Sequence, residues 1–307
     1  MSTFMPMLYS AWDSDIAYSF RKSRVAVIST LLLLAMFLAA ILAPHLAPQN
    51  PFDIAELSLF DSELPPAWAE GGNPAYLLGT DTQARDVLSS IMYGMRISLV
   101  VGFASVLLAA VLGVTLGLLG GFLGGIVDAV LMRIADVLLS FPPILVALLI
   151  NGVLRGALPQ SAQADSALIV LILSIGLTNW VQYARTVRGS TMVERRKEYI
   201  EAARTLGTGS VAIMVRHILP NVLGPVLVIA TINLGMAVLT EATLSFLGVG
   251  MPPTQPSLGT LIQIGNEFLF SGIWWVVVFP AAALAVLVLA VNLLGDWLRD
   301  ALNPKLR

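Results

Sequence analysis

The chain has 307 residues, of which 57% are hydrophobic and 12% are charged, whereas a soluble domain carries about 25% charged residues. This composition excludes an ordinary soluble protein and predicts an integral membrane protein. The net charge of −2 says little about binding partners, because the charged residues are sorted by position along the chain.

Side chains suited to catalysis or metal binding are scarce. The chain has no cysteine, which excludes disulfides, thiolate catalysis and Cys-ligated metals. Its two histidines, His45 and His217, are too far apart in sequence for a recognisable metal motif. None of its lysines lies in a glycine-rich phosphate-binding loop. We therefore expect no catalytic residue, cofactor or metal here, and the energy source must be another chain or an ion gradient.

Six apolar runs predict an all-α bundle of six transmembrane helices, because a helix needs about 20 residues to cross the hydrocarbon core. The expected spans are residues 25–44, 97–127, 137–154, 167–183, 222–240 and 273–295. The second run is too long for one ordinary span, so we place the following turn in the glycine-rich residues 120–125. The predicted organisation is a tail 1–24, a first span 25–44, a polar segment 45–96, a five-helix core 97–295 and a tail 296–307.

The distribution of basic residues predicts the orientation. Six spans place both termini, the 120–136 turn and the 184–221 loop on one side of the membrane. All but three of the 17 Lys and Arg residues fall on that side, the exceptions being Arg85, Arg96 and Arg155. The positive-inside rule makes the basic side cytoplasmic. Both termini are therefore expected in the cytoplasm, and residues 45–96 are expected outside.

Glycines in the second span indicate a helix contact. Gly113, Gly117 and Gly121 recur every four residues and so share one face of a helix. Small residues at this spacing let helices pack closely in lipid. We expect a packing role, with a place along a substrate path as the alternative.

Three residues are candidates for gating. Pro142 and Pro143 are expected to kink the third span. Such kinks are tolerated where neighbours or water satisfy the freed carbonyls. Glu241 lies at the far end of the fifth span. Acids inside a membrane are functional candidates, but an acid this close to an interface is more often hydrated.

The polar segment before the second span contains a further predicted helix. Thr80 or Asp81 is expected to cap a helix that runs to about Tyr93. Arg85 and Asp86 would then belong to a solvated helix end, with an i,i+4 ion pair from Asp81 to Arg85. A substrate-contact role is the alternative for these charges.

The longest charged stretch between apolar runs is residues 192–220. Its first part, residues 192–206, lacks Gly and Pro, and Tyr199, Ala203 and Leu206 recur at helical spacing on one apolar face. Charged residues occupy much of the remaining surface. This pattern predicts a short amphipathic helix.

A second short helix is predicted directly after the first. Gly207 is expected to end the first helix in a left-handed conformation, and Ser210 is expected to cap the second. Leu219 and Pro220 are expected to end that second helix. The two helices would form a compact knob.

The pattern of this knob resembles the EAA loop of ABC-importer permeases. The residues that carry the resemblance are Glu201, Ala202, Ala203, Gly207, Leu219 and Pro220. The family has Ile two residues before the Leu, whereas this chain has His217 there and Ile218 next to it. Residues 189–220 are therefore named the coupling segment.

Further stretches resemble the dipeptide, oligopeptide and nickel branch of these permeases. They are residues 42–51, 78–99 and 240–261. That branch usually has Gly where this chain has Ala84, and Arg where it has Ser90. The resemblance extends from about residue 12 to 307.

The resemblance implies a bacterial inner-membrane importer in which this chain is one of several subunits. It implies a second, homologous permease, two ATP-binding cassette subunits that bind ATP and Mg, and an extracytoplasmic substrate-binding protein. It also implies that the coupling segment, including Tyr199, docks in a groove of an ATPase subunit. We expect contact with membrane lipid and none with nucleic acid.

Peptides are the expected substrate, and nickel or another small solute is the alternative within the same branch. An ion-coupled secondary transporter would need acids near the bilayer midplane, and the predicted spans contain none there. A membrane-embedded enzyme would need a nucleophile or a metal cluster, for which the sequence offers no candidate.

Overall fold

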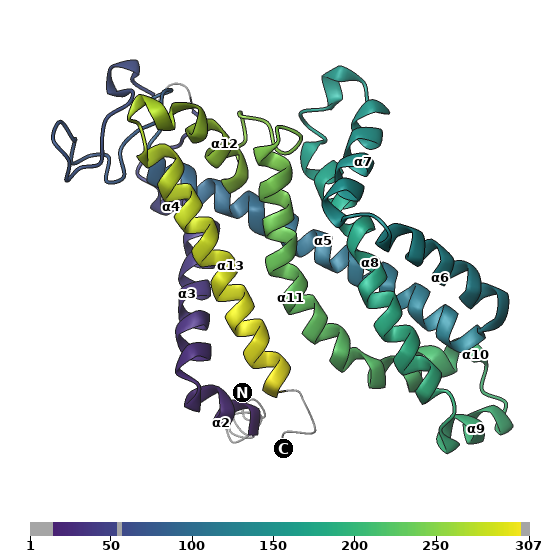
Figure 1. Cartoon of the computed structure of the whole chain (residues 1–307). Helices are drawn as coiled ribbons and strands as arrows, with labels where there is room; N and C mark the ends of the chain where they lie inside the picture. Colours follow the sequence, from purple (N-terminus) through teal and green to yellow (C-terminus); the bar gives the residue numbers. More distant parts are fainter. Residues whose placement is uncertain (1–14, 54–56, 302–307) are drawn as a thin grey trace.

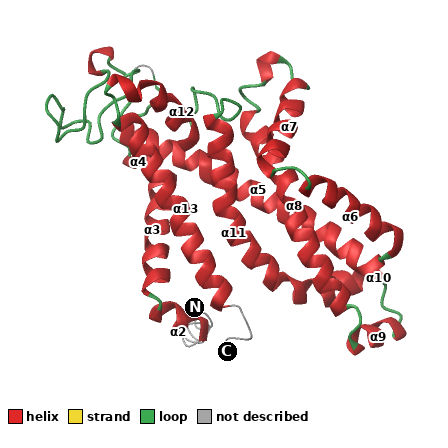
Figure 2. Ribbon diagram, viewed as in Figure 1, coloured by secondary structure: helices red, strands yellow, loops and turns green. Residues whose placement is uncertain are grey.

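The computed structural model describes residues 15–53 and 57–301, and this part of the chain is mostly helical (Figures 1 and 2). Its only β pairing is an isolated bridge between Thr80 and Asp86. In chain order the elements are α2 (Asp15–Lys22), α3 (Arg24–Ile41), α4 (Ala43–Leu46), η2 (Leu59–Asp61), α5 (Val87–Leu123), α6 (Gly125–Leu139), α7 (Pro143–Gly156), η3 (Gln160–Ala162), α8 (Ala167–Glu194), α9 (Glu198–Thr205), α10 (Ser210–Ala212), the π-helix η4 (Ile213–Ile218), α11 (Leu219–Phe246), α12 (Leu258–Phe268), η5 (Leu269–Ser271) and α13 (Trp275–Ala301).

The helices give five or six membrane crossings, in agreement with the predicted bundle. Among the described residues, α3, α5, α8, α13 and the continuous stretch of residues 210–246 are each long and apolar enough to span. The pair α6 and α7 passes the same test only jointly, with a bend of 100° between its two parts. The chain therefore crosses six times if this pair is one broken span.

The third span was predicted as a single kinked helix, and that prediction is wrong. The chain leaves the helical conformation after Leu139 and re-enters it at Pro143. Pro142 is extended, with ψ of 131°, and adjacent prolines cannot donate the hydrogen bonds that would continue α6. Pro143 fits the first turn of α7, where no amide donor is needed. The two prolines therefore break the span completely.

The second span and the helix expected before it form one element, α5. Its N-cap is Asp86, whose carboxylate accepts a hydrogen bond from the Ser89 amide at 2.7 Å, so neither Thr80 nor Asp81 caps it. Since no proline interrupts them, its 37 residues form a rod about 55 Å long. Gly124 and Gly125, with φ of 68° and 55°, then reverse the chain into α6 within the predicted turn.

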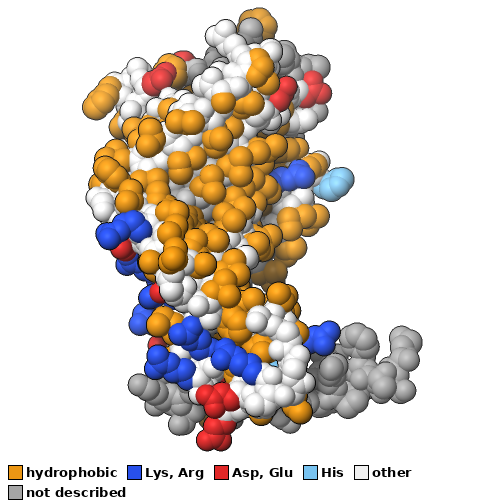
Figure 3. Space-filling model, turned by 90° about the vertical axis from the view of Figure 1, so that its right-hand side faces the viewer, with side chains coloured by type: hydrophobic (Ala, Val, Ile, Leu, Met, Phe, Trp, Pro, Cys, Tyr) orange, Lys and Arg blue, Asp and Glu red, His pale blue; other side chains and the backbone are white. Residues whose placement is uncertain are grey.

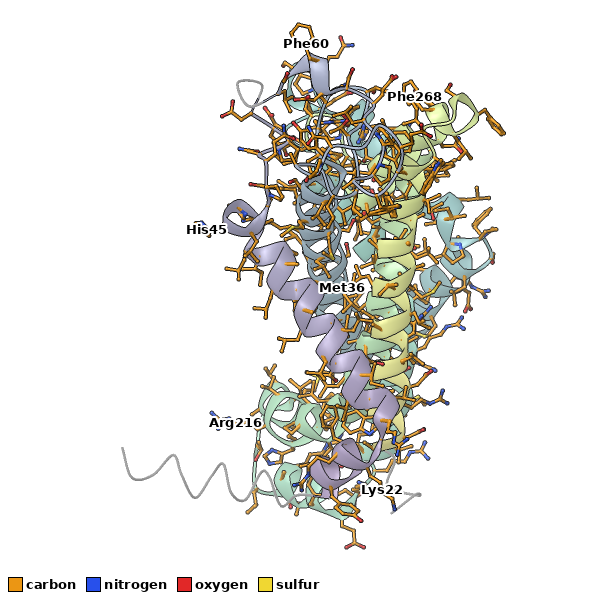
Figure 4. The ribbon with its side chains drawn as sticks, turned by 90° about the vertical axis from the view of Figure 1, so that its left-hand side faces the viewer. Lys22, Met36, His45, Phe60, Arg216 and Phe268 are labelled. Atoms are coloured by element: carbon orange, nitrogen blue, oxygen red, sulfur yellow. The ribbon has the colours of Figure 1, made fainter. Side chains whose placement is uncertain are left out.

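The bundle has two distinct ends. α2 and the last turns of α13 lie at the same end as α9, and Phe20 packs edge-on against Trp297 at 5.1 Å (Figure 1). The opposite end carries α4, residues 57–86 and α12. In Figure 4, Lys22 and Arg216 mark the first end, whereas Phe60 and Phe268 mark the second. We call these the basic end and the outer end.

The surface of the bundle agrees with a lipid environment. Figure 3 shows a broad apolar zone over the face that carries α6 and α7, with most of its Lys and Arg side chains in the lower half. Large apolar side chains such as Leu149 (68% exposed) and Leu107 (66% exposed) point outward. Exposed apolar area of this extent is a liability in water and the expected surface in a bilayer.

The glycine ridge of α5 packs directly against the backbone of α8. A Cβ added at Gly113 would lie 2.5 Å from the Trp180 carbonyl oxygen, and one at Gly117 would lie 2.6 Å from that of Ala184. At Gly121 the same atom would lie 2.8 Å from the Arg188 carbonyl oxygen. These separations leave no room for any side chain. The two helices are therefore in backbone contact along three turns.

We expect Gly117→Leu to separate α5 from α8 and to destabilise the protein by at least about 1–3 kcal/mol, the usual cost of overpacking. Thermal unfolding and the monodisperse yield in detergent would measure the loss. Gly189→Leu is the matched control, because Gly189 lies in the partner helix α8 but has no neighbouring atom near its missing side chain. Equal behaviour of the two variants would contradict a packing role for the ridge.

Candidate functional site

The coupling segment folds into two short helical pieces at the basic end, as predicted. α9 ends at Thr205, and Gly207 adopts a left-handed φ of 79°. The amide of Thr208 donates to the Ala203 carbonyl and that of Gly207 donates to the Arg204 carbonyl, both at 3.0 Å. This pair of bonds is the Schellman arrangement, which favours Gly at the left-handed position. The local sequence thus explains the sharp end of α9.

The face of α9 that packs inward differs from the predicted one. Ile200 and Ala203 are buried, together with Ile213 and Ile218 of the next helical piece. Leu206 was expected on this face but is 85% exposed. It follows the last turn of α9, so the helical spacing used for the prediction no longer applies to it.

The coupling segment is attached to the end of α5 through Phe122. Arg195 donates from Nη1 to the Phe122 carbonyl at 2.9 Å. The guanidinium of Arg204 lies 5.3 Å from the centre of the Phe122 ring, within the range of a cation–π contact. One residue of α5 therefore receives contacts from both sides of the turn between α8 and α9.

A second attachment joins the segment to the start of α11. The Tyr199 hydroxyl donates to the Glu194 carboxylate, and Asn221 donates from Nδ2 to the Tyr199 oxygen at 3.1 Å. Lys197 pairs with Glu194 at 2.8 Å. Burial of the hydroxyl and the adjacent carboxylate raise the pKa of Tyr199 to about 12, so Tyr199 remains a hydrogen-bond donor at physiological pH.

The second helical piece is longer than expected, and Pro220 does not end it. Gly209, rather than Ser210, is its N-cap residue. The chain then stays helical through η4 into α11, with a π-turn in which the Leu219 amide donates to the Met214 carbonyl. Pro220 lies in the first turn of α11, where its missing amide matters least. Asn221 supplies a donor to the His217 carbonyl at 2.7 Å.

The outward face of the coupling segment combines charge and exposed apolar side chains. Glu201 and Ala202 are exposed on α9. Leu206 and Val211 (70% exposed) lie on the adjoining turn and α10. The outward face of the knob thus carries a charged, a small and two apolar side chains, while its inner face is bonded to α5 and α11.

A buried polar network at the outer end surrounds Glu241. Its side chain is fully buried and accepts hydrogen bonds from Ser98 of α5 at 2.6 Å and from Ser245 of α11 at 2.7 Å. Ser257, which caps α12, donates to Ser245 at 3.2 Å. The expectation that Glu241 is hydrated is therefore wrong, because three helices close over it.

The α6–α8 contact includes ion pairs that local spacing did not predict. Arg188 of α8 forms a two-bond fork with Asp128 of α6, with Nη2 donating to Oδ2 at 2.6 Å. Arg185 pairs with Asp136. Acids on the neighbouring helix therefore hold both basic side chains.

The charges before α5 are buried, contrary to the solvated helix end that was predicted. Asp81 and Arg85 are each 3% exposed and pair at 2.6 Å, as the i,i+4 spacing indicated. Asp86 is fully buried, and burial raises its pKa while the hydrogen bonds from Ser89 oppose that rise. The Asp86 amide donates to Oε1 of Gln49 at 2.7 Å. The polar segment before α5 thus buries its own charged side chains.

The gating candidates occupy two separate places. Pro142 and Pro143 lie at the break between α6 and α7, whereas Glu241 lies between α5, α11 and α12.

The described residues hold no cluster of three or more His, Asp or Glu side chains suited to a metal ion.

Comparison with known proteins decides the family. Residues 113–307 match the family model described as the binding-protein-dependent transport system inner membrane component. The chain belongs to this family. Residues 10–66 match the N-terminal transmembrane domain of oligopeptide transport permease C. The protein is thus a multi-pass permease of a bacterial ABC importer, and the resemblance noted in its sequence is confirmed.

Several curated relatives align over nearly the whole chain. The dipeptide transport system permease protein DppC of Haemophilus influenzae is 40% identical over 290 residues, which cover 94% of each chain. DppC of Escherichia coli K12 is 41% identical over 94% of this chain and 91% of its own. The di/tripeptide permease DppC of Pseudomonas aeruginosa is 36% identical over 98% of this chain and 95% of its own.

A solved structure supports the fold. A chain of the MetNI methionine ABC transporter, in inward-facing conformations, aligns with a TM-score of 0.53 and 21% identity. The alignment covers 70% of this permease and 96% of that chain. The two proteins therefore share the helical core.

Sequence reasoning missed the residues that anchor the permease's candidate sites. Phe122 and Asn221 hold the coupling segment, and Ser98 and Ser257 hold Glu241. Only Ser257 had a usable signal in the sequence. It directly precedes an apolar run, and serine is a favoured N-cap residue at the start of a helix. The others act through contacts between residues that are far apart in sequence.

We expect Glu241→Ala to leave the hydroxyls of Ser98 and Ser245 without their acceptor, at a cost of about 1–3 kcal/mol for each unsatisfied buried group. Glu241→Gln keeps one acceptor oxygen and the side-chain shape, so its loss should be smaller. Thermal unfolding of the purified permease would rank the two. Glu267→Ala, on the exposed side of α12, is the control. An equal loss for Ala and Gln would contradict the network described.

Proposed function

We propose that this chain is one permease subunit of an ATP-driven importer of dipeptides and oligopeptides, and that all ATP hydrolysis takes place on partner chains. The observation that carries the proposal is the coupling segment, which is anchored on its inner face and exposed on its outer face at the basic end. Such a knob can transmit force to the bundle without performing chemistry. The chain itself binds no cofactor in this proposal, and ATP and Mg are held by the ATPase subunits.

The partners follow from the same geometry. A second, homologous permease would complete the translocation path, and two ATP-binding cassette subunits would dock at the basic end. An extracytoplasmic substrate-binding protein would deliver substrate to the outer end, where residues 57–86 and α12 lie. Lipid covers the apolar zone, and no nucleic acid is involved.

The contacts of Phe122 and Tyr199 suggest how motion would be transmitted. A shift of α9 would move Arg195 and Arg204, and with them the end of α5. The bond from Asn221 to Tyr199 would carry the same shift to α11. Because α5 is in backbone contact with α8, both helices would move together. Closure of the ATPases could thus change the packing along the whole bundle.

Peptides are favoured as substrate because three relatives at 36–41% identity are named for dipeptide or di/tripeptide transport. Nickel or another small solute remains the alternative within the branch. Uptake of a radiolabelled dipeptide and of nickel by proteoliposomes that hold the complete transporter would separate the two.

Ion-coupled transport is less well supported, although Glu241 is a buried acid. Glu241 lies five residues before the end of α11, about 7 Å along the helix axis. An ion-coupling acid is expected near the midplane between two repeats. Uptake that requires ATP and is insensitive to collapse of the proton gradient would exclude this alternative.

The orientation can be tested with single cysteines, since the chain contains none. We expect Glu70→Cys, an exposed position at the outer end, to react with an impermeant maleimide in intact cells. Ser210→Cys, at the basic end, should react only after lysis. Labelling of Ser210→Cys in intact cells would place the coupling segment outside and overturn the docking of ATPases there.

We expect Gly207→Val to abolish coupled transport while the permease remains inserted, because a β-branched residue strongly disfavours the left-handed φ at this position. Glu201→Lys should act similarly, by reversing the charge offered to the ATPase. Uptake and co-purification of the ATPases would be measured on the same preparations.

Gly209→Val is the matched control for Gly207→Val. Gly209 lies two residues away with an ordinary φ of −65° and open space around it, so a side chain there meets no neighbouring atom and needs no left-handed backbone. Gly207→Asn should retain more function than Gly207→Val, since Asn tolerates the left-handed region. If all these variants dock and transport normally, the coupling segment is only a connecting loop.

A further inference from the structure

A cavity at the outer end lies between the α7–α8 connection and the α11–α12 connection. Its volume is about 380 Å³, within the range of small-molecule sites. Three glutamines and one arginine supply its polar lining, namely Gln160, Gln163, Gln263 and Arg155. The site therefore combines one cation with several neutral amides.

The guanidinium of Arg155 is only partly satisfied. Its Nη2 donates to the Gly250 carbonyl, whereas its Nε is shielded from solvent and has no acceptor among the described residues. A buried donor without an acceptor is unusual and costly. The Nε–H of Arg155 is thus a hydrogen-bond donor for which an anionic oxygen would be the natural acceptor.

Two other arginines of this chain show which group normally binds the edge of the guanidinium formed by Nε and Nη2. Arg188 uses Nε and Nη2 together to hold the two oxygens of Asp128. Arg85 uses Nε to hold Asp81 at 2.6 Å. Planar carboxylates match the Nε–Nη2 edge in both geometry and charge. A carboxylate is therefore the chemical group that best fits Arg155.

The surroundings hold Arg155 in place. Gln163 donates from Nε2 to the Arg155 carbonyl at 3.2 Å and so closes the end of α7. Gly250 is packed so closely that an added Cβ would lie 2.3 Å from the Ser245 Cα. The carbonyl that Nη2 contacts is consequently fixed against α11. This rigidity prepares the cavity for a ligand at low entropic cost.

We propose that this cavity is a substrate subsite in which Arg155 binds the C-terminal carboxylate of an incoming peptide, a proposal that rests on peptide import as the function. The glutamine amides would then face the polar backbone of the peptide. The subsite lies where substrate released from a binding protein at the outer end would arrive.

The test combines two changes: removal of the carboxylate from the ligand and removal of the cation from the protein. Trialanine and trialanine amide differ in the carboxylate, and Arg155→Gln removes the cation. Because the binding protein is the same in both cases, its own preference cancels between wild type and variant. We expect Arg155→Gln to lower trialanine uptake by roughly tenfold or more, the usual effect of losing a charge-assisted hydrogen bond. Uptake of the amide should change less than about twofold.

Binding is measured separately from transport. The complete transporter in nanodiscs, without its binding protein, is titrated with trialanine by calorimetry. Wild type should bind trialanine more tightly than trialanine amide, and Arg155→Gln should lose that preference. Arg155→Lys keeps the charge without the fork and should be intermediate. Arg96→Gln, which removes an exposed cation elsewhere at the outer end, is the control and should behave as wild type.

Each outcome decides a separate question. Equal loss of acid and amide uptake in Arg155→Gln would mean that Arg155 only holds the Gly250 loop, and the subsite would be wrong. Loss of the acid preference in Arg96→Gln as well would reduce the effect to general charge and would also overturn it. Absence of trialanine binding to wild type would do the same. Arg155-dependent binding without any peptide uptake would retain the subsite and contradict the proposed function.

Discussion

The backbone contact between α5 and α8 is the constraint on which the rest of the fold depends. A bilayer offers no hydrophobic force between helices, so close van der Waals packing must hold them together. The glycines at 113, 117 and 121 allow that packing over three turns. α5 is also about 55 Å long, well beyond the 30 Å hydrocarbon core, so it reaches both ends of the bundle. The coupling segment and the Glu241 network are both bonded to α5 of this pair.

The two ends of α5 connect to the two candidate sites. Near its outer end Ser98 donates to Glu241, and through that network α11 and α12 are fixed. At its other end Phe122 receives Arg195 and Arg204 from the coupling segment. A rigid helix with a fixed contact at each end can carry a displacement over its full length.

Much of this arrangement could be predicted from local sequence signals. Hydrophobic runs indicated the spans, four-residue spacing indicated the glycine contact, and Gly207 indicated the end of α9. The failures arose where distant residues decide the environment. Glu241 is buried because Ser98, 143 positions away, covers it. Pro220 does not end its helix: two carbonyls that precede it are bonded, that of Met214 by the Leu219 amide in a π-turn and that of His217 by Asn221.

The treatment of charge at the outer end separates structural from functional residues. Arg85 is buried and its Nε pairs with Asp81 at 2.6 Å, and Glu241 is buried among serine hydroxyls that donate to it. In both cases the protein supplies the counterpart of each buried charge, as the cost of desolvation requires. Arg155 differs from Arg85 in that its shielded Nε has no acceptor among the described residues, whereas the Nε of Arg85 holds Asp81, and in that Arg155 lines a cavity. A permease that supplies an acid for Arg85 but none for Arg155 has a physical reason to receive an anionic group at the Arg155 cavity from outside the chain.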